Sequence, residues 1–428
     1  MGDIPTEVDR RTVLTGLGGG TIALAGCLGE DDSAEATVQE VEPGTSISVT
    51  AVWTEEEEED FRAVIDHVEA ETDLEITYEP RDTEAILTGT LMDYEAGVAT
   101  ADIVVIPSPA RVQSDAEGGH LASLEDTWDT DDFAPDPDTV SVDGEAYAAP
   151  FGMDLKPGFW YRESFFDEHG LEEPEDYDAF LDLLAEIDGI EGVEAPLASG
   201  NGDGWPLSDV VEAFILRQDD GHDLQRELID GEASFTDDRV VTAFEEIQDL
   251  LQDGYFSEVR DFGIQYEFFW ENEIPLYFMG SWTPTFEAIE DPDDLDVFML
   301  PGTEAMVAAE NWFTVPEYSE EVDAARAAVE EMVSADGQEV WAERGGFIAS
   351  NLDVPDEAYD LEIMRELSEL ADEVELVPDL DDTVGDPFQS EFWAVLTGFW
   401  AEPDQEIDPL LEGLDDVLEE SVGDIGEV

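Results

Sequence analysis

The stretch "SISVTAVWTEEEEEDFRAVIDHVEAETDLEITYEP", residues 46–80, holds two alternating segments separated by a helical one, and this order decides the fold class. Apolar side chains occupy every second position of the outer segments, which predicts strands with Ile47, Val49, Ala51 and Trp53, then Leu74, Ile76 and Tyr78. Between them, apolar residues recur at helical spacing at Phe61, Val64, Ile65 and Val68. A strand, a helix and a second strand in this order predict a βαβ unit with parallel strands.

The acidic run "EEEEED", residues 55–60, has two interpretations. It resembles a metal-binding or interaction tract, but it also begins the predicted helix. Acidic side chains in the first turn of a helix are stabilised by the helix dipole. We therefore interpret this run as the start of a helix.

The composition combines extreme acidity with enough apolar residues for a folded protein. The 428 residues carry a formal net charge of −100, yet 42% of them are hydrophobic and 10% are aromatic. A chain of this length can bury a sizeable core, and two cores are expected. In molar salt the Debye length falls to about 3 Å, so evenly spread carboxylates repel one another only weakly. The composition therefore indicates a protein of a halophile. The alternative is a polyanion that binds cationic partners. Because no basic patch exists, nucleic acid is not an expected partner.

The later sequence continues the alternation of strands and helices without a fixed-period repeat. Strands are predicted at 102–107 and twice within 274–300, and helices at 177–187, 207–216, 244–251 and 322–332. Open α/β sheets bind ligands at the carboxyl ends of their strands. Three segments lie at such ends, namely Trp53, residues 107–109 and residues 280–282.

The N-terminus reads as an export signal over residues 1–26. Arg10 and Arg11 precede an apolar, glycine-rich run that is too short for an ordinary membrane span, and this order resembles a twin-arginine signal. The sequence "LAGC" that ends at Cys27 resembles a lipobox, in which this cysteine is lipidated. The alternative is a chance arginine pair beside a chance cysteine. Cys27 is the only cysteine, which excludes a disulfide within the chain, and residues 27–45 read as a flexible acidic tether.

Tryptophans recur at predicted loop starts, each with a carboxylate or amide nearby. The set comprises Trp53, Asp154, Lys156, Trp205, Asp209, Trp282, Asn311 and Trp312. Aromatic faces cover the apolar faces of a pyranose ring, and Asp, Asn and Lys side chains bond its hydroxyls. The pattern therefore favours a sugar site.

Each of these residues also has a structural interpretation. Trp53 could face the core, Asp154 could cap a turn, Trp205 could pack as a hydrophobic staple, and Asp209 could serve the helix N-terminus. Lys156 is the only lysine of the chain and could be a structural ion-pair donor. Our hypothesis is that it reaches a cleft that holds the sugar, where it donates to a sugar hydroxyl or orients Asp154.

Several motifs, in order, resemble the extracellular solute-binding proteins (family 1) of sugar ABC transporters. They are "GEAYAAPFGMDLKPGFWYRESFFDEHGLEEPEDYDAFLDLLAEI" (144–187), "NEIPLYFMGSW" (272–282) and "GGFIASN" (345–351). The segments "LKPGFWY" and "GDGWPLSDVVEAFILR" are most similar to the α-glucoside-binding branch of that family. Together with the acidic composition, the resemblance suggests a protein of a halophilic archaeon.

The resemblance implies a two-lobe α/β fold like that of periplasmic binding proteins, with a ligand cleft between lobes. Each lobe would be a mainly parallel sheet flanked by helices. The N-lobe would comprise 46–150 and 303–338, and the C-lobe 151–302 and 339–428. Carried over by position, the resemblance makes Asp154 a hydroxyl ligand and Trp282 the stacking aromatic. It also adds Ser108, Arg111 and Phe347 as ligand contacts.

The resemblance further implies a function without chemistry. A lipid-anchored monomer on the extracellular face of the membrane would capture an oligosaccharide or α-glucoside by lobe closure and deliver it to an ABC permease. No cofactor or metal is expected, because the four histidines lack ligand spacing. The alternatives are a secreted glycoside hydrolase, which needs two carboxylates across the sugar, and a binding lipoprotein for a non-sugar solute. No G-x-S-x-G or HExxH motif is present.

Overall fold

The computed structural model describes residues 41–425, except 82, 136 and 201–203. The predicted export signal, Cys27 and most of the predicted tether lie outside the described residues. The described residues form a single compact unit. Within the described part of this unit, no helix is both long and apolar enough to cross a membrane.

The predicted βαβ unit is present at the start of this unit. Strand β1 (Ser46–Thr50) is followed by α1 (Glu55–Thr72) and by β2 (Glu75–Tyr78), and β2 pairs with β1 in parallel. On its other side β1 pairs in parallel with β3 (Ile103–Ile106), which is buried throughout. The acidic run at 55–60 therefore begins a helix, and Phe61 and Val64 on that helix are fully buried.

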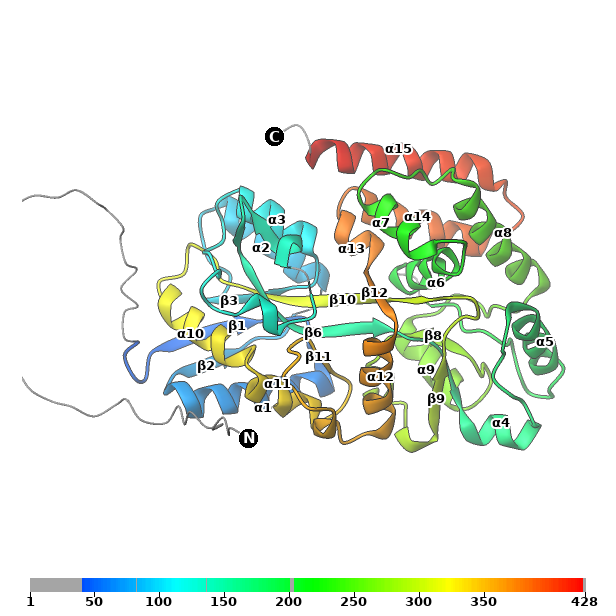
Figure 1. Cartoon of the computed structure of the whole chain (residues 1–428), viewed down its shortest axis with the longest axis horizontal. Coiled ribbons are helices and arrows are strands. Elements are labelled where there is room, and N and C mark those ends of the chain that lie inside the picture. Colours follow the sequence, from blue (N-terminus) through cyan, green and yellow to red (C-terminus); the bar gives the residue numbers. More distant parts are fainter. Residues whose placement is uncertain (1–40, 82, 136, 201–203, 426–428) are drawn as a thin grey trace, which may run out of the picture. The chain divides into compact units, whose positions relative to one another are not determined.

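Two long antiparallel strands extend this sheet. They are β6 (Ala148–Lys156) and β10 (Ala305–Thr314), and β10 also pairs with β3. Two shorter strands complete this seven-stranded sheet. Strand β11 (Ile348–Ala349) pairs with β6, and β12 (Glu375–Pro378) pairs in parallel with β10. Figure 1 shows β6 and β10 running between two groups of helices. The sheet is thus mixed rather than mainly parallel, because β6 and β10 run in opposite directions as they connect the two groups.

A second, antiparallel sheet follows directly from β6. It consists of β7 (Gly158–Arg162) between β8 (Tyr277–Met279) and β9 (Leu295–Phe298). The turn from β6 to β7 requires a glycine at 158, because its φ is +137° and an added Cβ would lie 2.1 Å from the Phe298 carbonyl oxygen. The sequence predicted β8 and β9, but it did not predict their antiparallel pairing with β7.

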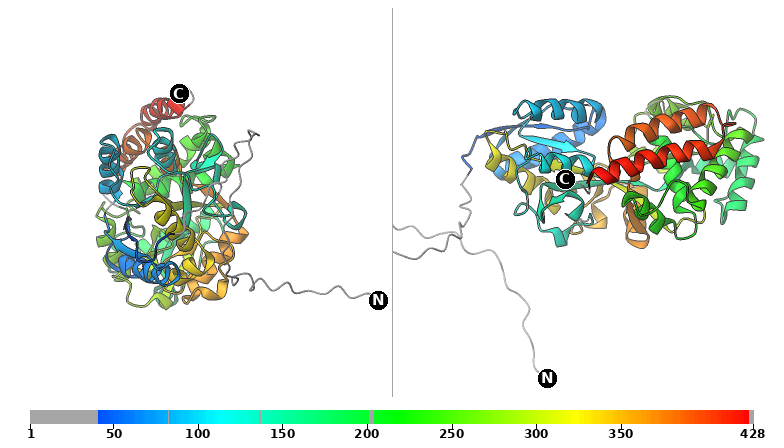
Figure 2. Two further views of the ribbon diagram at one scale, coloured as in Figure 1. Left: turned by 90° about the vertical axis from the view of Figure 1, so that its left-hand side faces the viewer. Right: turned by 90° about the horizontal axis from the view of Figure 1, so that it is seen from above.

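Helices cover both sheets (Figure 1). Those on the first sheet are α1, α2 (Thr83–Glu95), α3 (Pro109–Glu117), α10 (Val322–Met332) and α11 (Ala335–Ala342). Those around the second sheet are α4 (Glu163–His169), α5 (Tyr177–Asp188), α6 (Trp205–Leu216), α7 (Gly221–Ile229), α8 (Asp238–Asp253) and α9 (Phe262–Trp270). The C-terminal part adds α12 (Glu362–Glu373), α13 (Leu380–Val384), α14 (Phe388–Ala401) and α15 (Ile407–Ile425). Seen from above, α15, the red helix of Figure 2, runs beside α14. A small hairpin joins β4 (Ser141–Val142) to β5 (Glu145–Ala146).

Two large apolar cores stabilise the fold. The first contains Trp53, Phe61 and Trp341, and the second contains Phe180, Phe214 and residues of α14 and α15. The sequence assigns 339–428 to the C-lobe, but the segment just after 338 packs on α1 in the first core. The lobe boundaries stay a prediction.

Candidate functional site

Lys156 lies at the centre of a buried polar cluster where β6 ends. Its Nζ is 3.0 Å from Oδ2 of Asp209, and both side chains are almost fully buried. Asp209 reaches this position because α6 begins at Trp205, which places position 209 on the first turns of that helix. The structure therefore makes Lys156 an ion-pair donor, and the partner is Asp209 rather than Asp154.

Two indole rings flank the ammonium of Lys156. Its Nζ lies 4.6 Å from the ring centroid of Trp282 and 5.1 Å from that of Trp205. The two ring centroids are 5.9 Å apart and the planes are inclined by 59°. Cations are attracted to the negative faces of aromatic rings, most strongly to tryptophan. The structure thus brings together Lys156, Asp209, Trp205 and Trp282, which come from three separate segments.

The loop after β8 holds Trp282 against β6 through two hydrogen bonds between Ser281 and the backbone of Leu155. The amide of Ser281 donates to the carbonyl oxygen of Leu155 at 2.9 Å, and the amide of Leu155 donates to Oγ of Ser281 at 3.2 Å. Gly280 lets the indole fold back, because an added Cβ would lie 2.0 Å from the Trp282 ring.

Asp154 and Asn311 form a second polar pair beside this group. They lie on the paired strands β6 and β10, and Nδ2 of Asn311 donates to Oδ2 of Asp154 at 2.9 Å. The register of the two strands shifts between Asn311 and Trp312, which marks a β-bulge or irregularity at this point of the pairing. Burial raises the pKa of Asp154, while Lys156 and Asn311 partly counter that rise.

The electrostatics of the cluster are dominated by carboxylates. Burial alone would lower the pKa of Lys156, but Asp209, Asp379 and Asp154 outweigh it, so the net pKa is raised and the lysine stays charged. Burial and the nearby Asp379 raise the pKa of Asp209 to about 6, although Lys156 opposes this rise. Burial, with Asp379 and Asp154, raises the pKa of Glu310 to about 8.

More acidic side chains lie behind Asp209. Burial raises the pKa values of Glu212, Asp381 and Asp382 well above the usual range, and Asp379 raises each further. The sequence did not identify Glu212, Glu310, Asp379, Asp381 or Asp382 as site residues. Among 114 acidic residues no local signal distinguished them, because their burial depends on α6, β10 and α13 meeting in space.

Three expected ligand residues lie in packed interior instead. Trp53 packs against Phe61, Trp341 and two further rings, and it is buried. Trp312 is fully buried in a separate apolar cluster with Val104. The ring of Phe347 stacks on Trp341 with 5.1 Å between centroids.

Ser108 and Arg111 lie at the start of α3. The side chain of Ser108 caps this helix, and its Oγ donates to the backbone carbonyl of Asp382 at 2.9 Å. Arg111 pairs with Asp115 at 2.8 Å and donates to Thr90 at 3.2 Å. Ser108 therefore bonds to α13, next to the buried acids. Arg111 instead pairs with an aspartate of its own helix, α3, and bonds to the neighbouring helix α2.

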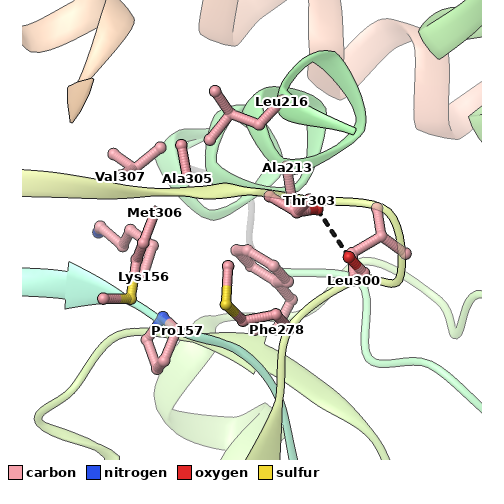
Figure 3. Close-up of a pocket in the computed structure, with 12 residues that line it drawn as sticks. Lys156, Pro157, Ala213, Leu216, Phe278, Leu300, Thr303, Ala305, Met306 and Val307 are labelled. Carbon is pink, nitrogen blue, oxygen red and sulfur yellow. Dashed lines mark hydrogen bonds between the residues drawn. The ribbon is translucent and has the colours of Figure 1, made fainter. Parts of the chain in front are cut away.

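A small cavity lies beside Lys156 (Figure 3). Its volume is about 10 Å³, and its lining is mostly apolar, with Pro157, Phe278 and Met306 among the lining residues. A space of this size holds about one water molecule. It is therefore too small for a sugar ring.

Indole faces, carboxylates and an amide thus converge at the junction of β6, α6 and β10. Residues 53–339 match the family described as bacterial extracellular solute-binding protein. The chain belongs to this family. An uncharacterised ABC transporter extracellular-binding protein of Pyrococcus horikoshii is 35% identical over 399 residues, which cover 92% of this chain and 93% of the relative. The alpha-glucosides-binding periplasmic protein AglE of Rhizobium meliloti is 27% identical over 345 residues, 74% of each chain.

Solved structures of other solute-binding proteins share the fold. The solute receptor AcbH, described as having an exclusive preference for β-D-galactopyranose, superposes with a TM-score of 0.77 at 19% identity, covering 89% of this chain and 99% of its own. A chitin oligosaccharide binding protein gives a TM-score of 0.77 at 19% identity, with coverage of 89% and 100%. The predicted two-lobe α/β fold is thereby confirmed. The family places this chain among solute-binding proteins of ABC transporters, not among enzymes.

Proposed function

We propose that this protein captures a sugar between its two lobes and presents it to an ABC permease. One observation carries the proposal: Trp205 and Trp282 lie within 5.9 Å of each other beside the Lys156–Asp209 and Asp154–Asn311 pairs. Two apolar faces next to charged and amide groups match the alternating apolar faces and hydroxyl rims of a pyranose.

The likeness to named sugar-binding proteins supports a carbohydrate ligand. AglE is described as binding alpha-glucosides, and two structural neighbours are described with galactopyranose and chitin oligosaccharide. We propose an α-glucoside or an oligosaccharide as the ligand class. The alternative ligand is a non-sugar solute. It is suggested by a Synechocystis relative of 23% identity, which is named an osmoprotective compounds-binding protein.

The mechanism is capture and closure. A ligand that contacts both lobes binds the closed state better and shifts the hinge equilibrium toward it. The lobes are proposed to be residues 46–150 with 303–338, and 151–302 with 339–428. Ser108 of α3 and Asp382 of α13 already meet across this division.

The cellular setting forms the second part of the proposal. The arginine pair and Cys27 would direct export and lipidation, so that a monomer is tethered by its acidic segment to the outer face of the membrane. The net charge of −100 supports a halophilic source, and the archaeal relative from Pyrococcus supports an archaeal one.

Tryptophan fluorescence in about 3 M salt tests the ligand class, since salt at that strength screens the acidic surface. Maltose, trehalose, galactose and chitobiose are titrated, with glycine betaine as the non-sugar probe. We expect saturable binding of a sugar and a loss of about tenfold or more in Trp282→Ala, since aromatic contacts contribute on the order of 1 kcal/mol beyond buried area. Trp128→Phe is the control, because Trp128 packs against Phe133 away from Lys156.

Three results would reject the proposal. Saturable binding of glycine betaine without any sugar binding would move the ligand to another class. Equal sugar affinity in Trp282→Ala and in Trp128→Phe would place the site elsewhere. Release of glucose from maltose or trehalose would favour the hydrolase alternative.

A further inference from the structure

The buried acids behind Lys156 converge on Asp379. We name the Asp379 cluster as Asp209, Glu212, Asp379, Asp381 and Asp382. One carboxylate oxygen each from Asp209, Glu212 and Asp379 lie within 4.8 Å of one another, and the same holds for Asp379, Asp381 and Asp382. Asp379 is common to both groups because it caps α13 and faces the start of α6.

Two carboxylate oxygens of this cluster find no hydrogen-bond donor among the described residues. Oε2 of Glu212 accepts from Gln225 and from the amide of Leu380, but its Oε1 is buried and has no partner. Oδ2 of Asp381 accepts from Trp393 at 2.7 Å, but its Oδ1 is likewise buried without a partner. Glu212 is 0% exposed and Asp381 is 2% exposed. Buried polar atoms are nearly always satisfied, so each of these two oxygens requires a proton, a water or a cation.

The protein does not supply enough positive charge for five carboxylates. The charge of Lys156 lowers the pKa values of Asp209, Asp379 and Asp382. Its ammonium, however, already pairs with Asp209 and lies between two indoles. The hydrogen bonds to Glu212 and Asp381 come from neutral donors. They are Gln225 and the Leu380 amide for Glu212, and Gln389, Trp393 and Ser208 for Asp381. One ammonium therefore leaves several buried carboxyls that need either a proton or a second cation.

We propose that the Asp379 cluster binds a hard divalent cation, with Ca²⁺ as the best match. Its ligands would be carboxylate oxygens alone, the donor set that hard cations prefer. A Ca²⁺–oxygen distance of about 2.4 Å lets one ion contact two oxygens that lie about 4.8 Å apart. Mg²⁺ binds at about 2.1 Å and usually keeps several waters, so a mostly buried site with only carboxylate ligands suits Ca²⁺ better. The cluster shares Asp209 with the proposed sugar site, but cation binding is measured without sugar and does not depend on the sugar proposal.

A cation here would fasten α6 to α13. Asp209 and Glu212 belong to α6, while the three remaining ligands lie at the start of α13. Since Ser108 binds the backbone of Asp382, the ion would also stiffen the segment that α3 contacts.

Tb³⁺, a luminescent substitute for Ca²⁺, provides a direct test. The Trp393 indole bonds to Asp381, so Tb³⁺ in the cluster would be excited through a neighbouring tryptophan. The full chain is titrated in about 3 M KCl to suppress binding to surface acids. We expect a saturable signal that Ca²⁺ displaces more effectively than Mg²⁺, and a loss of affinity of about tenfold or more in Asp379→Asn and in Glu212→Gln, because each removes a charged ligand.

The matched control is the double variant Glu125→Gln/Asp126→Asn. These two acids line a surface groove beside Trp128, so they test weak binding near an indole outside the cluster. The saturable signal should survive in this control.

Thermal unfolding gives an independent measurement. Ca²⁺ at constant ionic strength should raise the midpoint of the wild type more than Mg²⁺ does, and it should not raise that of Asp379→Asn. In EDTA, Asp379→Asn should unfold at a higher temperature than the wild type, because a buried like charge has been removed. The proposal is overturned if the Tb³⁺ titrations of the wild type and of both cluster variants coincide. It is also overturned if Ca²⁺ shifts the unfolding midpoints of the wild type and of Asp379→Asn equally. In either case, protons shared among the carboxyls would neutralise the cluster.

Discussion

Oγ of Ser108 donates a hydrogen bond to the carbonyl oxygen of Asp382 at 2.9 Å, although the two residues are 274 positions apart. Ser108 starts α3 on the first sheet, and Asp382 lies in α13, which packs with α7 and α14 of the second group of helices. The hydrogen bond thus joins the two halves of the molecule next to the buried acids. Any motion that separates these halves must break it.

Removing this hydrogen bond should weaken sugar binding. Ser108→Ala removes a neutral hydrogen bond between the proposed lobes, which usually contributes about 0.5–1.5 kcal/mol. Under the proposed closure mechanism the dissociation constant should therefore rise between about 2-fold and 10-fold. Sugar titration by tryptophan fluorescence measures the change. Ser108→Thr keeps the hydroxyl and should restore affinity.

Ser319→Ala is the control for a general loss of stability. The hydroxyl of Ser319 bonds to Asp102 at 2.7 Å, and this bond lies within the first half of the molecule. If Ser319→Ala weakens sugar binding as much as Ser108→Ala does, the Ser108–Asp382 bond has no special role in closure.

Loss of the single lysine should destabilise the protein strongly. Lys156→Met leaves Asp209 buried without its cation, and breaking a buried ion pair on one side costs about 3–5 kcal/mol. Denaturant unfolding measures the free energy. The double variant Lys156→Met/Asp209→Asn removes both charges and should recover part of the loss. A change of less than about 1 kcal/mol in Lys156→Met would contradict a structural role for this pair.

Much of the fold follows from patterns that are local in the sequence. The βαβ unit at 46–80 was predictable because strand and helix periodicities are set by which face each residue buries. The helices with Phe180 and Phe244 were predictable for the same reason. The pairing of β7 with β8 and β9 was not, because strands more than a hundred residues apart carry no local sign of their partners.

The candidate site was predictable only in part. Trp205 and Trp282 could be proposed because each begins a loop or helix next to glycine, where side chains reach a ligand. Trp53 and Trp312 looked the same in sequence, but both face packed interior, and an indole suits either place. Lys156 was noticed for its rarity, yet its partner Asp209 could be assigned only once α6 was placed beside β6.

Stability should fall as the pH rises from mildly acidic to alkaline. Burial raises the folded-state pKa of Glu310 from 4.5 to about 8, and that of Asp209 from 3.8 to about 6. Over these pH intervals the folded state still holds protons that the unfolded state has released. The stability that this proton binding contributes is therefore fully present below the unfolded-state pKa and is lost as the pH rises through the folded-state pKa. Unfolding midpoints at constant salt between pH 5 and pH 9, on the order of one pH unit apart, measure this slope.

Glu310→Gln should flatten the alkaline part of this slope, because its amide does not ionise. The exposed Glu172→Gln is the control and should leave the slope unchanged. A wild-type midpoint that is constant or rising between pH 6 and pH 9 would show that Glu310 ionises freely in the folded protein.

Gly280 provides a test of whether Trp282 must lie against Lys156. In Gly280→Ala the new methyl group would meet the Trp282 ring at 2.0 Å, so the indole must leave its place over the ammonium. We expect a changed tryptophan emission spectrum and a sugar affinity lowered by about tenfold, close to that of Trp282→Ala. Gly398→Ala is the control, because Gly398 lies inside α14 with open space around it, and alanine there should stabilise the helix by about 0.5–1 kcal/mol. If Gly280→Ala binds sugar as well as Gly398→Ala does, the position of Trp282 over Lys156 is not what recognises the ligand.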